Sequence, residues 1–119
     1  MIVLDMQDSR PLYYQVVEKF QNLILLGILE ENDKMPSVRT MAMELSINPN
    51  TIQKAYAELE RRGYIYTVKG RGNFVCNIKE LRDKEKEKLL EGIKELVKAA
   101  SEIDITREEI VEIIDTIMK

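Results

Sequence analysis

Five consecutive positions of a predicted helix near the middle of the chain include two amides, a hydroxyl and an ammonium. The residues are Asn50, Thr51, Gln53 and Lys54. Apolar residues three and four positions apart form the opposite, buried stripe of that helix: Ile52, Ala55, Tyr56 and Leu59. A solvated helix face normally carries Glu and Lys, whereas amides, hydroxyls and ammonium groups contact base edges and phosphates. The pattern therefore favours a surface that binds nucleic acid.

A second short helix is predicted directly before this one. Ser37 is a suitable N-cap residue, and the apolar residues that follow share one face: Val38, Met41, Ala42 and Leu45. Residues 46–49 then interrupt the pattern, and Pro49 suits the first turn of the next helix with Asn48 as its capping residue. Two short amphipathic helices separated by a tight polar break indicate a helix-turn-helix.

A β-hairpin is predicted after the second of these helices. Residues 64–68 and 73–76 are rich in β-branched and aromatic side chains, and they flank Lys69, Gly70, Arg71 and Gly72. A hairpin here completes a winged helix-turn-helix, and its two cations beside two glycines favour a wing that lies on phosphates or in the minor groove. Gly63 is expected in a left-handed conformation, and Arg61 and Arg62 suit the helix C-terminus better than a phosphate contact.

A longer helix is predicted before the helix-turn-helix. Its apolar stripe has a period of about 3.6 residues and consists of Leu12, Val16, Val17, Phe20, Leu23 and Ile24. Gly27 is a suitable residue to end it. Tyr13 and Tyr14 could contact a phosphate or a partner chain, but packing with a solvated hydroxyl is the favoured interpretation. Asn32, in the polar connector that follows, is expected in a left-handed turn.

Length and composition fit one small globular domain, or a domain with an appendage, in 119 residues. The chain has no histidine and a single cysteine, Cys76, which excludes an internal disulfide and a Cys/His zinc site. We interpret Cys76 as a small buried hydrophobe. Without a long apolar run or a signal-like N-terminus, we expect a soluble cytoplasmic protein. The sequence contains no acid–base pair at a plausible site, so we expect neither an enzyme nor a cofactor.

Charge changes sign along the chain. The whole chain has a formal net charge of −3, yet residues 34–76 hold seven basic and three acidic side chains, a local charge of +4. The flanking residues 1–33 and 77–119 carry −4 and −3. A positive middle between acidic ends allows a DNA-facing surface in an acidic protein.

Several motifs occur in an order that resembles a known family. They are PLYYQ at 11–15, MPSVR at 35–39, NPNT at 48–51, AY at 55–56, LE at 59–60 and GRGNFV at 70–75. Over roughly residues 10–76 the chain looks like a GntR-type transcriptional regulator of the short YtrA-like subfamily. The resemblance implies DNA contacts at Arg39, Asn48, Asn50, Thr51, Gln53, Lys54, Lys69, Gly70 and Arg71. Asn32 stands where the family usually has glycine, which keeps the turn geometry.

Residues 79–119 differ in character from the predicted winged helix-turn-helix at 1–78. Alternating charges lead into one amphipathic helix over 81–100, and Thr106 and Glu109 form a capping box for a final helix. Such narrow stripes would be exposed in a monomer. We therefore expect dimerisation with a second copy through Leu89, Ile93, Leu96, Val97, Ile110, Ile113, Ile114 and Ile117. The alternative is that both helices fold back on their own winged helix.

The sequence thus predicts a mainly α fold with a small β-hairpin wing, followed by a two-helix C-terminal dimerisation element. The preferred function is a sequence-specific DNA-binding transcriptional regulator, a repressor that binds a palindromic operator in double-stranded DNA as a homodimer. Asn50 and Gln53 could pair with adenine and Lys54 with guanine. The alternative is a winged-helix protein-interaction module that does not bind DNA. A small-molecule effector is left open, and no residue identifies one.

Overall fold

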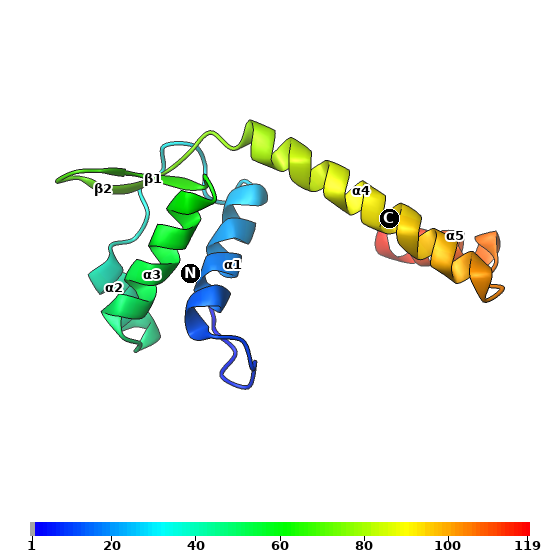
Figure 1. The fold of residues 1–119 in the computed structure, drawn as a ribbon, viewed down its shortest axis with the longest axis horizontal. Helices are drawn as coiled ribbons and strands as arrows, with labels where there is room; N and C mark the ends of the chain where they lie inside the picture. The colour runs from blue at the N-terminus through cyan, green and yellow to red at the C-terminus, as the bar shows by residue number, and fades with distance from the viewer. Residues whose placement is uncertain (1) are drawn as a thin grey trace. The chain divides into compact units, whose positions relative to one another are not determined.

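The computed structural model describes residues 2–119, which fall into two compact units (Figure 1). The first unit reaches to Lys79, and the second spans Glu80–Lys119. These residues form five helices and one two-stranded antiparallel sheet. The predicted mainly α fold with a small hairpin is confirmed.

A side-chain cap and a left-handed residue set the limits of α2 (Val38–Leu45). The Ser37 hydroxyl oxygen accepts a hydrogen bond from the Thr40 N–H at 3.0 Å, which satisfies one of the free donors of the first turn. Ser46 ends the helix with a φ of 55°, and α3 (Pro49–Arg61) begins three residues later. The helix-turn-helix indicated by the sequence is confirmed.

The core of the first unit lies between α1 (Leu12–Leu25) and α3. Phe20 of α1 and Tyr56 of α3 meet edge to face, with ring centroids 5.7 Å apart. The Tyr56 hydroxyl donates to the Pro36 carbonyl at 2.7 Å and ties α3 to the segment that enters α2. Further apolar side chains complete this core: Ile2, Val16, Val17, Ile24, Met35, Met41, Ala42, Ile52, Ala55, Leu59, Tyr64, Ile65 and Val75. The predicted stripe of α3 is buried along its whole length.

The hairpin consists of β1 (Ile65–Val68) and β2 (Gly72–Val75). The strands pair antiparallel, with Ile65 opposite Val75 and Val68 opposite Gly72. The predicted hairpin is confirmed, although β1 begins one residue later than predicted and β2 lies one residue earlier.

The connector before α2 pairs with the free edge of β2. The N–H groups of Asn32 and Met35 each donate to a β2 carbonyl at 2.8 Å. Between them, Lys34 forms an antiparallel bridge with Phe74. Asn32 has a φ of 69°, which confirms the expected left-handed turn. The sequence indicated only a polar connector, because these residues lack the alternation of apolar and polar side chains that marks a strand.

Gln15 of α1 fastens the N-terminal segment to the core. Its Oε1 accepts the Asp5 N–H at 2.9 Å, and its Nε2 donates to the Asp5 carbonyl at 3.1 Å. The amide thus pairs with the backbone as a neighbouring strand would. Gln15 is only 2 % exposed, so burial shields both bonds from water.

Cys76 follows β2 directly and is half-buried. The interpretation of Cys76 as a small buried hydrophobe therefore holds only in part, because the strand ends at Val75 and the side chain that follows is partly exposed. Burial still raises the pKa of the Cys76 thiol, and the charge of Glu60 adds to that shift. The reactive thiolate form is therefore disfavoured.

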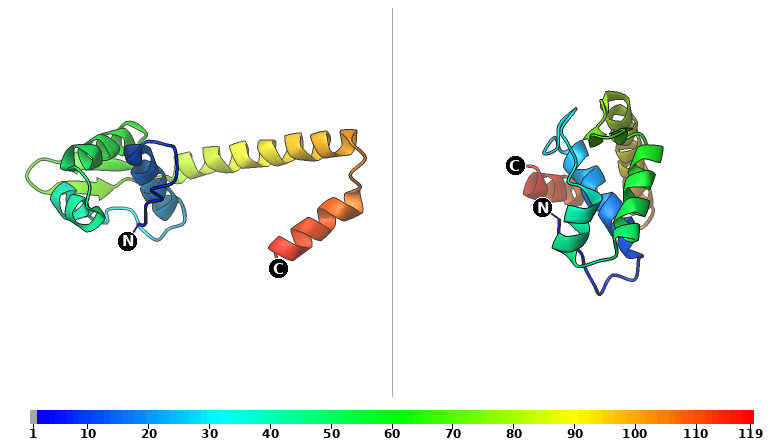
Figure 2. Two further views of the ribbon diagram at one scale, coloured as in Figure 1. Left: turned by 90° about the horizontal axis from the view of Figure 1, so that it is seen from below. Right: turned by 90° about the vertical axis from the view of Figure 1, so that its left-hand side faces the viewer.

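The second unit is built from α4 (Lys79–Glu102) and α5 (Arg107–Ile117). Asp104, with a φ of 63°, lies in the turn between them. The Thr106 hydroxyl accepts the Glu109 N–H at 3.2 Å, and the Glu109 carboxylate accepts the Thr106 N–H at 3.4 Å. The predicted capping box is confirmed. Figure 2 shows that α5 turns back from the end of α4 and diverges from it.

Candidate nucleic-acid interface

The first turn of α3 is built by two adjacent residues. Asn48 Oδ1 accepts the Asn50 N–H at 2.8 Å, and Pro49 occupies the first helical position, where its missing N–H costs nothing. The cap uses the Asn48 oxygen and leaves its NH2 group free to donate. Asn48 is therefore a structural residue that keeps one donor for a ligand.

The outer face of α3 carries the residues that were predicted to contact DNA. Asn50, Gln53 and Lys54 are exposed, and Thr51 is half-buried. Within residues 2–119, the side chains of Asn50, Thr51 and Gln53 make no hydrogen bond. Their donors and acceptors are available to a ligand without any internal bond being broken.

The middle of α3 is held by Tyr56. Burial raises the pKa of the Tyr56 hydroxyl, and the charge of Glu44 adds to that shift. The hydroxyl thus stays protonated and keeps its bond to the Pro36 carbonyl.

The last turn of α3 is held by two arginines that share one carboxylate. Glu58 accepts hydrogen bonds from Arg61 and Arg62 at 2.6 to 2.7 Å, and Arg62 also donates to Gln21 of α1 at 3.1 Å. These bonds lower the pKa of Glu58 to about 2. The arrangement favours the interpretation of both arginines as helix-end residues.

Arg39 lies exposed in the first turn of α2, whose buried residues are Met41 and Ala42. Its guanidinium makes no ion pair or hydrogen bond with any other described residue of the chain. A free guanidinium on this helix is available to a phosphate.

Lys69, Gly70 and Arg71 form the exposed tip of the wing. The Arg71 N–H donates to the Val68 carbonyl at 2.9 Å and closes the turn. Gly70 has a φ of 79°, a conformation that strongly favours glycine. The turn therefore presents two cations and leaves the backbone between them accessible.

Thr67 joins the wing to α3. Its hydroxyl lies 2.5 Å from a carboxylate oxygen of Glu60 and 2.8 Å from the side-chain oxygen of Asn73. Glu60 belongs to α3, and Asn73 belongs to β2. The contact couples the wing to the helix that carries the polar face.

Lys34 adds a cation to the wing that the site prediction missed. Its bridge to Phe74 places it beside β2. A Cβ on Gly72, whose φ is 121°, would lie 3.2 Å from the Lys34 Cε. The charge count included Lys34 in the basic segment, but no local pattern signalled its pairing with the wing.

The two adjacent tyrosines of α1 have different surroundings. Tyr14 contacts two guanidinium groups, with Arg10 at 5.5 Å and Arg62 at 5.9 Å from its ring centroid. The Tyr13 ring instead meets Lys54, whose Nζ lies 3.9 Å from the centroid. Tyr13 thus contacts the polar face of α3, whereas Tyr14 contacts two arginines that lie outside that face.

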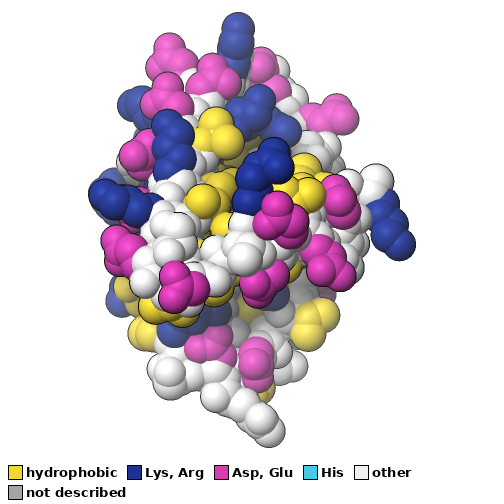
Figure 3. Space-filling view, turned by 90° about the vertical axis from the view of Figure 1, so that its right-hand side faces the viewer, with side chains coloured by type: hydrophobic (Ala, Val, Ile, Leu, Met, Phe, Trp, Pro, Cys, Tyr) yellow, Lys and Arg dark blue, Asp and Glu magenta, His cyan; other side chains and the backbone are white. Residues whose placement is uncertain are grey.

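The eight residues predicted to form a dimer all lie on α4 and α5. Seven are exposed, from 41 % at Val97 to 75 % at Ile117, and Ile110 is half-buried. Four further large apolar side chains of this unit are also exposed: Leu90, Ile103, Val111 and Met118. Figure 3 shows hydrophobic side chains gathered on this end of the chain and surrounded by charged ones.

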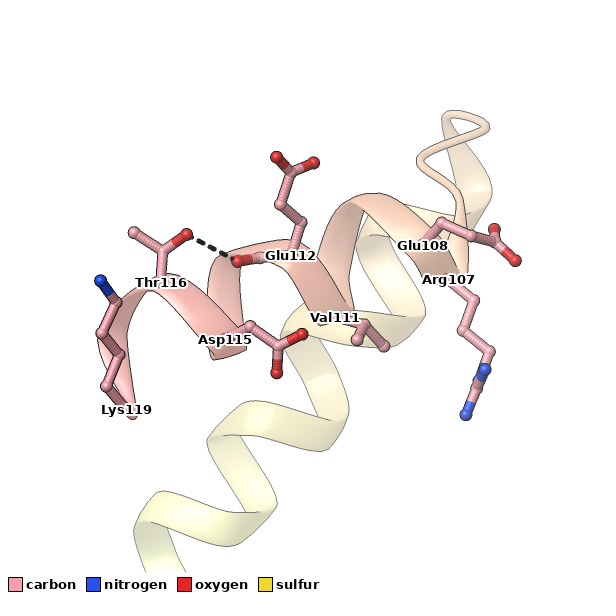
Figure 4. A pocket seen from close by; sticks show the side chains of 7 residues that line it. All are labelled: Arg107, Glu108, Val111, Glu112, Asp115, Thr116 and Lys119. Atoms are coloured by element: carbon pink, nitrogen blue, oxygen red, sulfur yellow. Dashed lines mark hydrogen bonds between the residues drawn. The ribbon is translucent and has the colours of Figure 1, made fainter.

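An open hollow of about 380 Å³ lies along α5 (Figure 4). Its lining residues are Arg107, Glu108, Val111, Glu112, Asp115, Thr116 and Lys119. All belong to one helix or its end, so no second wall encloses a small molecule there. This hollow does not define an effector site.

Residues 2–119 contain no group of three or more histidine, cysteine or acidic side chains placed to hold a metal ion. No helix in the described part of the chain is both long and apolar enough to cross a membrane.

A helix-turn-helix whose second helix is followed by an antiparallel hairpin is a winged helix-turn-helix, a class of DNA-binding fold. Residues 12–75 match the family described as "Bacterial regulatory proteins, gntR family", and the chain belongs to that family. The predicted family is confirmed.

The similarity to named relatives extends beyond the winged helix-turn-helix. The chain is 40 % identical over 111 residues to the "Uncharacterized HTH-type transcriptional regulator YhcF" of Bacillus subtilis (strain 168), and the match covers 92 % of each chain. It is 41 % identical over 98 residues to the "HTH-type transcriptional repressor YtrA" of the same organism, with 82 % of this chain and 71 % of YtrA covered. The predicted likeness to YtrA is confirmed.

Solved structures of transcriptional regulators are also similar to this chain. A transcriptional regulator from Oenococcus oeni matches with a TM-score of 0.78 and 31 % identity over the full length of both chains. The DNA-binding domain of AraR in complex with operator ORE1 matches with a TM-score of 0.55 and 30 % identity, over 62 % of this chain and 90 % of that one. The chain is thus a DNA-binding transcriptional regulator and not an enzyme.

Proposed function

We propose that this regulator is a cytoplasmic repressor that binds a palindromic operator as a homodimer. The observation that carries the proposal is the outer face of α3, where Asn50, Thr51 and Gln53 have unpaired polar groups above a buried apolar stripe. Such a helix can enter the major groove without losing internal bonds. The similarity to YtrA, which is named a repressor, supports the direction of regulation.

In this proposal α3 supplies the contacts that read sequence. The amides of Asn50 and Gln53 suit adenine, and each good pair discriminates against a wrong base by about 1–3 kcal/mol. The Thr51 hydroxyl and the free NH2 group of Asn48 add contacts along the same helix. The ammonium of Lys54 adds a contact to the DNA beside them.

Cations outside α3 hold the DNA backbone. Arg39 approaches from α2, while Lys69 and Arg71 approach from the wing, where Gly70 lets the backbone come close. The AraR complex with its operator supports binding of DNA by this fold. The local charge of +4 over residues 34–76 supports attraction to phosphates.

A second copy of this chain is the partner that fits the second unit. Neither α4 nor α5 buries a side chain within the chain. Soluble monomers rarely expose contiguous apolar patches larger than a few hundred Å². A symmetric dimer would cover these residues and present two α3 helices to two half-sites about 34 Å apart, or a multiple of that spacing.

A mobility-shift titration with the DNA immediately upstream of the gene tests the proposal. We expect selective binding over scrambled competitor, two chains per site, and an affinity that falls steeply with salt at a slope of about −0.9 per phosphate contact. Gln53→Ala should reduce the selectivity. A matched amide change outside the proposed interface, Asn22→Ala on the exposed face of α1, should leave the base preference unaltered.

Equal binding to scrambled DNA would contradict sequence-specific regulation through this site. Absence of DNA binding in both low and moderate salt would favour the alternative of a winged-helix protein-interaction module.

A further inference from the structure

Lys54 of α3 lies against an aromatic ring that belongs to α1. Its Nζ is 3.9 Å from the centroid of the Tyr13 ring, a distance at which a cation is attracted to the ring face. Resting on the function proposed above, we propose that Tyr13 is a positioning residue that directs Lys54 to a DNA backbone phosphate rather than to a base.

The core of the first unit fixes the distance between the two helices that carry the ring and the ammonium. Tyr13 is the second residue of α1, and Lys54 belongs to the exposed face of α3. The two helices share the core contact between Phe20 and Tyr56, whose centroids are 5.7 Å apart. Because both helices are anchored in one core, the ring stays beside α3 when Lys54 moves.

The direction of the Lys54 side chain favours a phosphate. Its ammonium reaches across from α3 to the Tyr13 ring on α1. A base edge on the floor of the major groove would draw the ammonium off the ring, whereas phosphates line the edges of the groove. Lys54 can therefore meet a phosphate and keep its contact with Tyr13.

An open hollow of about 440 Å³ adjoins this contact and leaves room for a phosphate. Its lining residues are Pro11, Leu12, Tyr13, Asn50, Thr51 and Lys54. They supply an amide, the hydroxyls of Thr51 and Tyr13 and an ammonium as donors, and no carboxylate that would repel an anion. An ammonium has three N–H donors, so a ring on one side leaves donors for a phosphate oxygen.

Restraint of a flexible lysine explains why the ring should matter for affinity. A free lysine side chain loses much rotamer freedom when it makes a contact. A ring that already holds the ammonium reduces that loss. For a solvent-exposed cation–π contact, the expected effect on the dissociation constant is about two- to fivefold.

Fluorescence anisotropy on the operator selected by the wild-type protein tests the role of Tyr13. Tyr13→Leu should weaken binding about two- to fivefold, whereas Tyr13→Phe, which keeps the ring, should bind as the wild type does. In a Lys54→Met background, Tyr13→Leu should have no further effect. Tyr14→Leu is the matched control, because its ring contacts Arg10 and Arg62 and not Lys54.

A readout without DNA shows whether the ring contact exists in the free protein. The Lys54 ε-methylene protons should shift upfield in the NMR spectrum through the ring current, in the wild type and in Tyr13→Phe. They should return to ordinary values in Tyr13→Leu, and its melting temperature reports whether that variant is folded.

A set of operators, each changed at a single base pair, distinguishes a phosphate contact from a base contact. Lys54→Met should weaken binding to all of them by the same factor and reduce the salt slope by about 0.9 per chain. A changed preference at one base pair would overturn the assignment of Lys54 to a phosphate.

Other results would overturn the role of Tyr13. They are unchanged or tighter binding by Tyr13→Leu, an equal loss in Tyr13→Phe, or an equal loss in the Lys54→Met background. Failure of the proposed function is distinguishable, because the wild type itself would then show no selective binding, and the role of Tyr13 would fall with it.

Discussion

Two asparagines at the start of α3 have different tasks although they lie two residues apart. Asn48 uses its oxygen to cap the helix, whereas the Asn50 side chain has no partner among residues 2–119. One residue type therefore contributes stability at one position and recognition at the other. The sequence predicted the cap at Asn48, and the family resemblance implied a DNA contact at both asparagines. Neither showed that the cap uses the Asn48 oxygen and leaves the Asn50 side chain without an internal bond among the described residues.

Alanine substitutions separate these tasks. Asn48→Ala should lower the free energy of unfolding by about 0.5–2 kcal/mol through loss of the cap, and Asn48→Asp should restore most of it. Asn50→Ala should change stability by less than about 0.5 kcal/mol but weaken operator binding about tenfold or more. Urea unfolding and anisotropy measure the two effects, and equal destabilisation by both alanine variants would contradict the assignment.

Glu58 makes part of the stability depend on acid. Arg61 and Arg62 hold its pKa at about 2, below the ordinary value of 4.5. A lowered pKa in the folded state stabilises the fold above pH 4.5, and this contribution is lost as the pH falls through about 2.

Glu58→Gln should therefore flatten the pH dependence of stability on the acid side. Between pH 5 and pH 2, the urea midpoint of the wild type should fall further than that of the variant. From pH 6 to 8, the two midpoints should change in parallel. The same acid-induced loss in both proteins would show that Glu58 does not titrate as described.

At the scale of elements, local signals predicted the helices well. Ser37, the Asn48–Pro49 pair and Thr106 each mark a helix start through a bond to a residue two or three positions on. The hairpin was predicted because its two strands are adjacent in sequence. Pairing of the connector at Lys34 with β2 was not predicted, because it joins residues about forty positions apart and such contacts leave no periodic pattern.

Thr67 tests whether the wing and α3 act as one element. Thr67→Val keeps the shape and β-propensity but removes the bonds to Glu60 and Asn73. We expect a loss of about 0.5–1.5 kcal/mol in stability and weaker operator binding. Thr116→Val is the matched control, because that hydroxyl only donates to the Glu112 carbonyl within α5. Unaltered DNA binding by Thr67→Val would argue against coupling.

At the scale of the whole molecule, the local charge predicted which segment binds DNA, and the apolar stripes predicted which segment forms a dimer. Residues 34–76 are basic, and the apolar residues of α4 and α5 lack cover within the chain. The geometry of a dimer could not be predicted, because a narrow stripe shows that a helix needs a partner but not at what angle the partner lies.

Ile113→Lys should break the proposed dimer. A lysine in place of this exposed isoleucine puts an unpaired charge into an apolar contact. Sedimentation velocity at micromolar concentration should show a monomer, and operator affinity should fall because two half-sites are no longer bound together. Asp115→Lys places the same side chain on the other face of α5 and should remain dimeric. A wild-type protein that sediments as a monomer would contradict this proposal outright.

Hydroxyl-radical footprinting of the wild-type protein on its upstream DNA tests the central claim most directly, because it reports the symmetry of the bound complex. We predict two protected patches related by a two-fold axis, on one face of the duplex and about one helical turn apart or a multiple of it. A single asymmetric patch, or no protection where binding is saturated, would contradict a dimer that places two α3 helices on a palindrome.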